Sequence, residues 1–293
     1  MHELLGYIFA FISSICFSIY IIPKKIAKEN NWYYMFYMSI GFVIVSLFSF
    51  FLIGDRESLF VWPALLTIVR GFLWVIATYL FLNSIDKIGI SRSTQYKNLK
   101  GPIGVLLILI CLQEFQVTNF VYVIISAILI FISALIFTIK KDNVKINYKG
   151  VVMALMSSVI LGLTALIQKY VTNLGYVYMQ QFWHSITVFV SVAIIVLIKD
   201  RGYKSLWNVT LRNKLLAATG GILYYFATFF NVNSYKYLPA SIAFIVINLS
   251  TIWSVILGIT LFKEIDFKKN WKRIILGFMV ALLGITTLFL AKK

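Results

Sequence analysis

The sequence predicts an all-α membrane protein with ten transmembrane helices, arranged as two inverted five-helix repeats. Of its 293 residues, 61% are hydrophobic and only 13% are charged, whereas a soluble domain carries about 25% charged residues. Apolar stretches of roughly twenty residues, the length of a helix that crosses a bilayer, recur along the whole chain. A weak match between the two halves of the chain supports the division into repeats.

Each predicted span is an apolar stretch, and the connections are too short to hold a sizeable aqueous domain. Aromatic residues gather at several span ends, as in "NNWYYMFY", where an interfacial belt is expected. The two cysteines lie inside spans and indicate no disulfide framework. The first span lacks the features of a cleaved signal peptide, so we expect it to be retained. The spans are predicted at 4–22, 33–53, 63–85, 90–112, 118–139, 149–171, 176–198, 213–235, 240–262 and 271–291.

The net charge of +17 comes mainly from short loops. Most Lys and Arg residues lie in every second connection, beginning with the one between the first two spans, and therefore on one side of the membrane. By the positive-inside rule these loops face the cytoplasm. The sequence thus predicts a multi-pass protein of the plasma (inner) membrane with both termini outside, and this placement of charge argues against nucleic acid as a partner.

The basic loop "KKDNVKINYK" divides the chain into two predicted repeats, residues 1–143 and 144–293. Because each repeat holds an odd number of spans, the second copy enters the membrane upside down, as in many secondary transporters. An offset of 150 residues aligns polar as well as apolar identities. They include Gly71 with Gly221, Thr78 with Thr228, Asn83 with Asn233, Ser84 with Ser234, Ser91 with Ser241, Asn98 with Asn248 and Glu114 with Glu264.

These features resemble the drug/metabolite transporter superfamily, and in particular its EamA-like ten-helix carriers. In both halves the fourth helix closes on an acidic residue, "LLILICLQE" and then "LGITLFKE". Within the superfamily, "GISRSTQYKNLKGPIGVLL" is most similar to the bacterial glucose/ribose uptake branch. The resemblance implies a carrier without an open pore that works by alternating access, with the third, fourth, eighth and ninth helices around the path of a sugar.

Two cations lie inside the predicted span 90–112. Lys97 and Lys100 are about 10 and 15 Å from its start at a rise of 1.5 Å per residue. A charged side chain at the centre of a span costs about 2.5–3.5 kcal/mol, so it usually faces a cavity or a partner. Snorkelling to the interface is the alternative, easier for Lys97 than for Lys100. We expect both to bind substrate.

Helical spacing places Ser93 on the same predicted helix face as the two lysines. The matching positions of the second repeat are Ala243, Ile247 and Ser250. The cations therefore belong to one half only, and we expect them to give the protein its particular specificity. Asn98 and Asn248 recur in both halves and are interpreted as mainly structural, although Asn248 is also a candidate for substrate contact.

The remaining candidate substrate-binding residues are polar or aromatic. Trp74, Tyr224 and Tyr225 could stack on a ring, with simple packing as the alternative. Gln181 and His184 could coordinate a polar solute. His184 could also carry a proton, with a structural hydrogen bond as the alternative.

Other polar residues are expected near the membrane surfaces. Arg70 should snorkel to the outer interface or line an outer vestibule, and Gln168 and Lys169 should be interfacial. Glu114 should pair with a basic residue at the surface. No acidic residue is predicted at mid-membrane, which lowers the expectation of a cationic substrate.

The sequence thus predicts a secondary transporter of a small polar organic solute, a sugar or related metabolite. Two alternatives are a carrier of anionic metabolites (sugar phosphate, carboxylate or amino acid) recognised by the lysines, and a metabolite or drug exporter. A membrane-embedded enzyme is a distant alternative, because the sequence has no H-x-x-x-H, G-x-S-x-G or paired intramembrane carboxylates. We expect no catalytic residue, metal or cofactor. The expected partners are the solute and the lipid bilayer, with a monomer as one option for the assembly.

Overall fold

The computed structural model describes residues 2–53, 59–97, 99–116, 118–136, 147–200, 204–262 and 267–290, and every regular element in these ranges is a helix. The elements are α1 (His2–Ile19), α2 (Ile22–Ala27), α3 (Asn31–Ile53), α4 (Pro63–Ile88), α5 (Ile90–Lys97), α6 (Lys100–Cys111), the 3-10 helix η2 (Glu114–Gln116), α7 (Phe120–Ile136), α8 (Tyr148–Asn173), α9 (Tyr178–Asp200), α10 (Lys204–Trp207), α11 (Leu211–Tyr237), α12 (Ala240–Ile247), α13 (Ser250–Thr260) and α14 (Phe267–Phe289).

Six helical stretches in the described ranges are long and apolar enough to cross a membrane. Helices α1 and α2 together form the first of them, and the other five are α3, α4, α8, α9 and α11. Their mean hydropathies lie between 1.4 and 2.3. Each coincides with a predicted span, so the described residues confirm the helical class and are consistent with an α-helical membrane protein. The full count of ten spans, the inverted repeats and the boundary between residues 143 and 144 stay predictions.

Two of the predicted spans are not continuous helices. The span 90–112 is divided into α5 and α6, and the span 240–262 into α12 and α13. At the second interruption the N–H groups of Asn248 and Leu249 reach carbonyls three residues back, at 3.1 and 3.0 Å, which tightens the helix into a turn. The expectation of unbroken helices is wrong here, because local turn bonding replaces the regular pattern.

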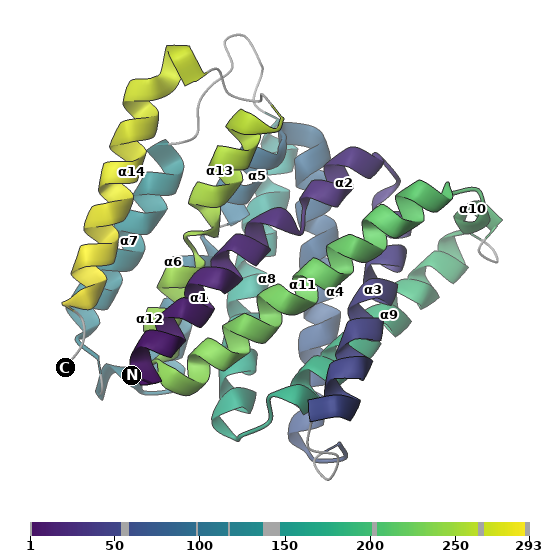
Figure 1. Ribbon diagram of the computed structural model, residues 1–293, viewed down its shortest axis with the longest axis horizontal. Coiled ribbons are helices and arrows are strands. Elements are labelled where there is room, and N and C mark those ends of the chain that lie inside the picture. Colours follow the sequence, from purple (N-terminus) through teal and green to yellow (C-terminus); the bar gives the residue numbers. More distant parts are fainter. Residues whose placement is uncertain are drawn as a thin grey trace.

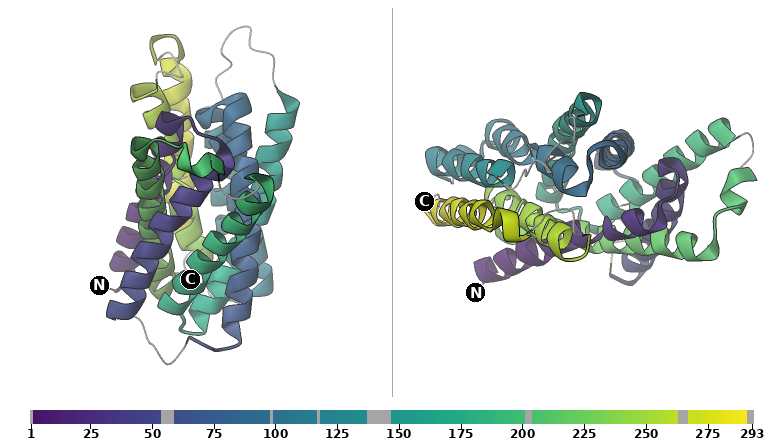
Figure 2. Two further views of the ribbon diagram at one scale, coloured as in Figure 1. Left: turned by 90° about the vertical axis from the view of Figure 1, so that its right-hand side faces the viewer. Right: turned by 90° about the horizontal axis from the view of Figure 1, so that it is seen from above.

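Helices from the two halves of the chain lie side by side. Extensive contacts join α1 with α11, α3 with α9, α4 with α8 and α7 with α14, and each of these pairs takes one helix from each half. Seen from the side, the long helices run roughly upright (Figure 2, left), but α1 and α11 slant across α4 and α8 (Figure 1). The start of α1 and the end of α14 lie at one end of the molecule, whereas α2 and α10 lie at the other (Figure 1).

Glycines allow some of these helices to approach closely. A Cβ atom added at Gly41 on α3 would collide with the backbone of Ala218 on α11, and one at Gly221 would collide with the backbone of Met38. Small residues of this kind let helix backbones meet in a membrane, where packing rather than exclusion of water drives association.

Two large apolar clusters and a smaller one around Phe50 and Met179 make up the apolar core of the described residues. One large cluster gathers Tyr34, Phe42, Trp74, Val188 and Tyr224 with their neighbours on α3, α4, α9 and α11. The other large cluster gathers apolar side chains of α6, α7, α12 and α14. Because α4 and α11 border the first cluster and α6 and α12 the second, polar side chains of these helices can meet between the clusters.

Candidate functional site

A cavity of about 50 Å³ lies in the interior and takes its walls from both halves of the chain. Its lining comes from the middle parts of α4, α8 and α11, together with the ends of α1, α5 and α6 that face them and Phe244 on α12. We call it the central cavity. The helix interruption between Lys97 and Lys100 borders it, and broken helices are typical of the binding sites of transporters.

Lys97 lines the central cavity from the last residue of α5 and is only 7% exposed. Its ammonium nitrogen lies 3.7 Å from the centre of the Phe81 ring and donates a hydrogen bond of 3.2 Å to the hydroxyl of Tyr20. A cation held over an aromatic face is attracted by the ring quadrupole. These contacts explain how the lysine stays buried without a carboxylate.

Lys100 lines the same cavity from the first residue of α6 and is 8% exposed. Its ammonium nitrogen lies 5.1 Å from the centre of the Phe17 ring and 6.0 Å from that of Phe244. Among the described residues it has no hydrogen-bond acceptor or ion-pair partner. Lys100 therefore brings a charge and free hydrogen-bond donors to the cavity.

Arg70 supplies a third cation to the central cavity and is 2% exposed. Its guanidinium donates hydrogen bonds to the side-chain oxygens of Gln168, at 3.0 Å, and Gln180, at 3.3 Å. The expectation that Arg70 snorkels to the surface or lines an outer vestibule is wrong, and so is the interfacial placement of Gln168. Amide oxygens of α8 and α9 accept two hydrogen bonds from the guanidinium and hold the side chain inside the protein.

No carboxylate is present among the described residues that line the central cavity. Arg70, Lys97 and Lys100 therefore give it three positive charges that neighbouring protein groups do not neutralise. In a site shielded from water such charges act strongly on a ligand. The arrangement favours an anion.

Aromatic rings form much of the remaining wall. Trp74 and Tyr224 both line the cavity, with ring centres 4.7 Å apart. His184 lies directly behind them, fully buried, with its ring centre 5.8 Å from Trp74 and 6.4 Å from Tyr224. Neither ring nitrogen of His184 has a hydrogen-bond partner in the described part of the chain. Its roles in proton or substrate binding stay predictions.

Of the nine candidate residues, Lys97, Lys100, Trp74 and Tyr224 line the cavity, and the other five lie outside its lining. The Ser93 hydroxyl forms a hydrogen bond of 2.8 Å with that of Ser84. Because Ser93 is in α5 and Lys100 begins α6, the two residues do not share one continuous helix face. Tyr225 packs on Phe229, Gln181 accepts a hydrogen bond from Thr228, and Asn248 donates one to the carbonyl of Phe244. Asn98 lies outside the described residues.

Sequence reasoning missed the residues that hold the cations in place. Phe17 lies in α1, Tyr20 in the turn that follows it, Phe81 in α4 and Phe244 in α12, and no spacing pattern connects them with the lysines. The charge of Arg70 inside a span was a usable signal. Its amide partners could not be found from the sequence, because they are about a hundred residues away along the chain.

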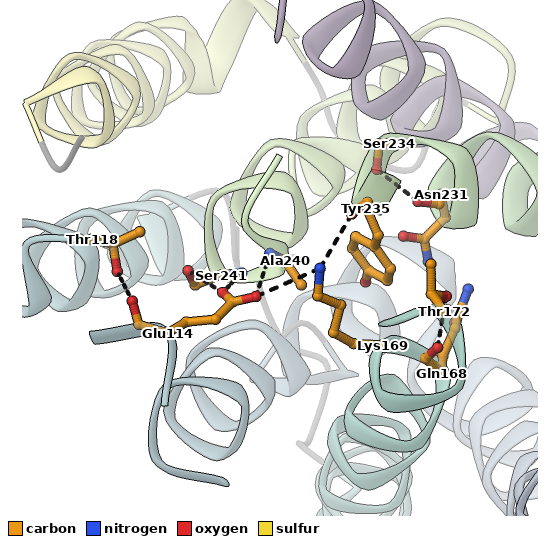
Figure 3. Close-up of polar contacts among 10 residues, drawn as sticks. All are labelled: Glu114, Thr118, Gln168, Lys169, Thr172, Asn231, Ser234, Tyr235, Ala240 and Ser241. Atoms are coloured by element: carbon orange, nitrogen blue, oxygen red, sulfur yellow. Dashed lines mark hydrogen bonds and ion pairs between the residues drawn. The ribbon is translucent and has the colours of Figure 1, made fainter. Parts of the chain in front are cut away.

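A buried polar cluster closes the molecule at the end where α11 meets α12 (Figure 3). The carboxylate of Glu114 accepts hydrogen bonds from the backbone N–H groups of Ala240 and Ser241, both at 2.9 Å, and from the Ser241 hydroxyl at 2.7 Å. The ammonium of Lys169 lies 3.7 Å from this carboxylate and donates to the carbonyl of Tyr235 at 3.2 Å. We call these residues the end cluster.

The end cluster corrects two expectations. Lys169 is 6% exposed, so its side chain lies inside the protein and not on the surface. Glu114 has the expected basic partner, but the pair is buried and lies between the two halves of the chain rather than at the surface. The matched hydrogen bonds at the start of α12 explain why a carboxylate is tolerated there.

A larger cavity of about 860 Å³ lies at the opposite end, among α2, the start of α3 and the ends of α4 and α9. We call it the vestibule. Lys24, Lys25, Lys28 and Lys199 line it together with only two carboxylates, Glu29 and Asp86. Since Asp86 pairs with Lys24 at 3.7 Å, the walls of the vestibule remain net positive.

Comparison with known proteins adds to this picture. Residues 148–290 match the EamA-like transporter family. The EamA-like segment contributes α8, α9 and α11 to α14, including the cavity residues Gln168, Tyr224 and Phe244. The match supports a membrane transporter of small solutes and does not address the glucose/ribose branch, which stays a prediction.

The fold of the whole chain is also found among solved structures. One crystal structure of a protein superposes on this chain with a TM-score of 0.73 and 10% sequence identity. The alignment covers 96% of this chain and 95% of the chain in that structure. At that identity the likeness shows the fold alone, but it includes the half that precedes the EamA-like segment. No curated protein matches the chain.

Proposed function

We propose that the whole chain is a member of the drug/metabolite transporter superfamily and a secondary transporter that moves a small organic anion across the plasma membrane. The observation that carries the proposal is the set of three cations, Arg70, Lys97 and Lys100, on a central cavity without a described carboxylate. The EamA-like match over residues 148–290 supports transport rather than catalysis. The anion is the alternative that the lysines already favoured in the sequence.

The protein compensates the charge of its buried cations only in part. Removing an ion from water costs several kcal/mol even after the protein relaxes, and a cation–π contact returns only about 0.5–2 kcal/mol. Lys100, which has ring contacts but no described acceptor, is left with the largest deficit. A bound anion would offset this cost, and it would explain why two lysines lie in a polar segment between two strongly apolar stretches.

The two ends of the molecule differ in a way that supports alternating access. The vestibule opens at the end that the positive-inside rule predicts to be cytoplasmic, whereas the end cluster ties the two halves together at the other end. We interpret this arrangement as a conformation open toward the cytoplasm. In the opposite conformation the contacts of Glu114 would break and the vestibule would close.

A neutral sugar is the second candidate substrate. The rings of Trp74 and Tyr224 could cover the apolar face of a sugar, and the amide groups of Gln168 and Asn231 in the same lining could bind hydroxyls. A neutral sugar would not compensate the charges of the three cations, so the observations favour the anion.

The test is an uptake screen with purified protein in proteoliposomes, using labelled carboxylates, sugar phosphates, amino acids and neutral sugars. We expect an organic anion to be carried and recovered unchanged, with its flux reduced at least tenfold in Lys100→Gln. The exposed Lys87 on the last turn of α4 gives the matched control, Lys87→Gln, which should keep wild-type flux. Better transport of neutral sugars than of any anion, or full flux in Lys100→Gln, would overturn the proposal.

A further inference from the structure

The positive charges of the central cavity stand at two separate ends of it. Arg70, Trp74, Thr78 and Phe81 follow helical spacing on α4 and all line the cavity, so they share one face of that helix. The backbone positions of Arg70 and Phe81 are about 16 Å apart along the axis of α4, at a rise of 1.5 Å per residue. Because the Lys97 ammonium lies over the Phe81 ring, Lys97 and Arg70 mark opposite ends of this wall.

The guanidinium of Arg70 is held by neutral groups only. Its two described partners are amide oxygens, of Gln168 and Gln180, which use two of its five N–H donors and leave its charge in place. The side-chain nitrogen of Gln168, beside it in the lining, has no hydrogen-bond partner among the described residues. Arg70 and Gln168 together thus offer a planar fork and an amide donor, a combination that suits a carboxylate or a phosphate.

We propose that the transported anion carries two negatively charged groups, one bound between Lys97 and Lys100 and the other at Arg70. This inference rests on the proposed function and narrows its substrate class. A solute with one negative charge would leave the positive charge at one end of the cavity uncompensated, whereas a dianion would compensate the charges at both ends. The stretch between the charged groups would lie along Trp74 and Tyr224 and can be apolar or ring-shaped.

A purely structural role for Arg70, in joining α4 to α8 and α9, would affect every ligand alike. The distinguishing readout is therefore how the affinity depends on the charge of the ligand. Succinate, adipate, suberate and sebacate can each be compared with the monocarboxylate of equal carbon number, that is butyrate, hexanoate, octanoate and decanoate. Each pair differs in one terminal carboxylate, and calorimetry on the purified full chain measures the affinities.

We expect at least one dicarboxylate to bind wild type roughly ten- to a hundredfold more tightly than its monocarboxylate, as a hydrogen-bonded charge pair would provide. In Arg70→Gln this preference should fall to about one while the affinity for the monocarboxylate stays unchanged. Lys100→Gln should weaken binding of both. Arg212→Gln removes an exposed positive charge at the start of α11 and should change neither.

Equal binding of both members of every pair to wild type would overturn the inference and leave the organic-anion proposal standing. A preference retained in Arg70→Gln would overturn it as well. If Arg70→Gln does not fold, Arg70→Lys keeps a positive charge but loses the fork, and a preference reduced severalfold or more is expected; an undiminished preference counts against Arg70. If neither set of acids bound, the proposed function itself would fail.

Discussion

At the scale of single residues, the molecule keeps three cations out of water without giving them carboxylates. Lys97 and Lys100 lie against aromatic rings, and Arg70 is bound by two amides. These partners compensate a buried charge only in part. The local environment is therefore suited to an anion that arrives and leaves, because permanent carboxylates would neutralise the site and compete with it.

Tyr20→Phe tests how the buried charge of Lys97 is held. The change keeps the ring but removes the hydroxyl that accepts the hydrogen bond from the lysine. We expect the free energy of unfolding of the ligand-free protein to fall by about 1–3 kcal/mol, since a hydrogen bond to a charged group is lost. Thermal unfolding in detergent measures it. If the Tyr20 hydroxyl stabilised the protein independently of the lysine, a Lys97→Met background would show the same loss.

The sequence predicted that Lys97 and Lys100 face a cavity, because their charges lie between two strongly apolar stretches, and both line the central cavity. It could not predict what surrounds them. The rings and amides that contact the cations lie on other helices, and their positions depend on how the halves pack. For the same reason Arg70 and Lys169 were expected at the membrane surfaces, although both are buried with partners.

At the scale of elements, two interrupted helices shape the site. The first of them separates α5, which ends at Lys97, from α6, which begins at Lys100. The second separates α12, which ends at Ile247, from α13, which begins at Ser250, so both breaks come at matching positions of the two halves. The alignment showed shared Asn and Leu residues at these positions without indicating a break. In α6 the break is followed by Pro102, which lacks an N–H group and therefore suits the first turn of a helix.

Glu114→Gln tests the tie between η2 and α12. The change leaves Lys169 as a buried cation without its ion-pair partner, and we expect the free energy of unfolding to fall by about 3–5 kcal/mol. The double variant with Lys169→Met should recover a large part of the loss, because no unpaired charge remains. A double-mutant cycle from thermal unfolding provides the measurement. Simple addition of the two single losses would contradict the coupling.

Gly221→Leu tests the close approach of α11 and α3. Its side chain would enter the space taken by the backbone of Met38 and Phe42, so we expect a loss of at least about 1–3 kcal/mol in stability or failure to fold. Thr219→Leu adds similar bulk at an exposed position of the same helix and should be tolerated. Chromatographic profile and melting temperature distinguish the two, and equal tolerance would show that the helices are not in close contact.

At the scale of the whole molecule, the two halves of the chain pack against each other rather than forming separate bodies. The most extensive helix contacts each take one partner from each half, and the central cavity lies where the halves meet. The sequence predicted the helical class and the general position of the site between the halves. The asymmetry between the open vestibule and the closed end cluster is a property of packing that no sequence pattern reveals.

Side-chain accessibility tests the orientation. In a background without Cys16 and Cys111, a cysteine at Asn30, beside the vestibule, should react with a membrane-impermeant label only from the cytoplasmic side. A cysteine at Gln116, an exposed residue of η2 near the end cluster, should react only from outside. The positive-inside rule gives this direction, and the reverse pattern of labelling would contradict it.

The central claim, a carrier that binds an organic anion through its buried cations, is tested most directly by exchange across a sealed membrane. Proteoliposomes are loaded with the unlabelled anion that the uptake screen finds to be carried best, with glucose, or with buffer, and uptake of the labelled anion is followed. We expect severalfold faster uptake with the anion inside than with glucose or buffer, and loss of this acceleration in Lys100→Gln but not in Lys87→Gln. Equal uptake under all three loadings, or acceleration that survives in Lys100→Gln, would contradict it.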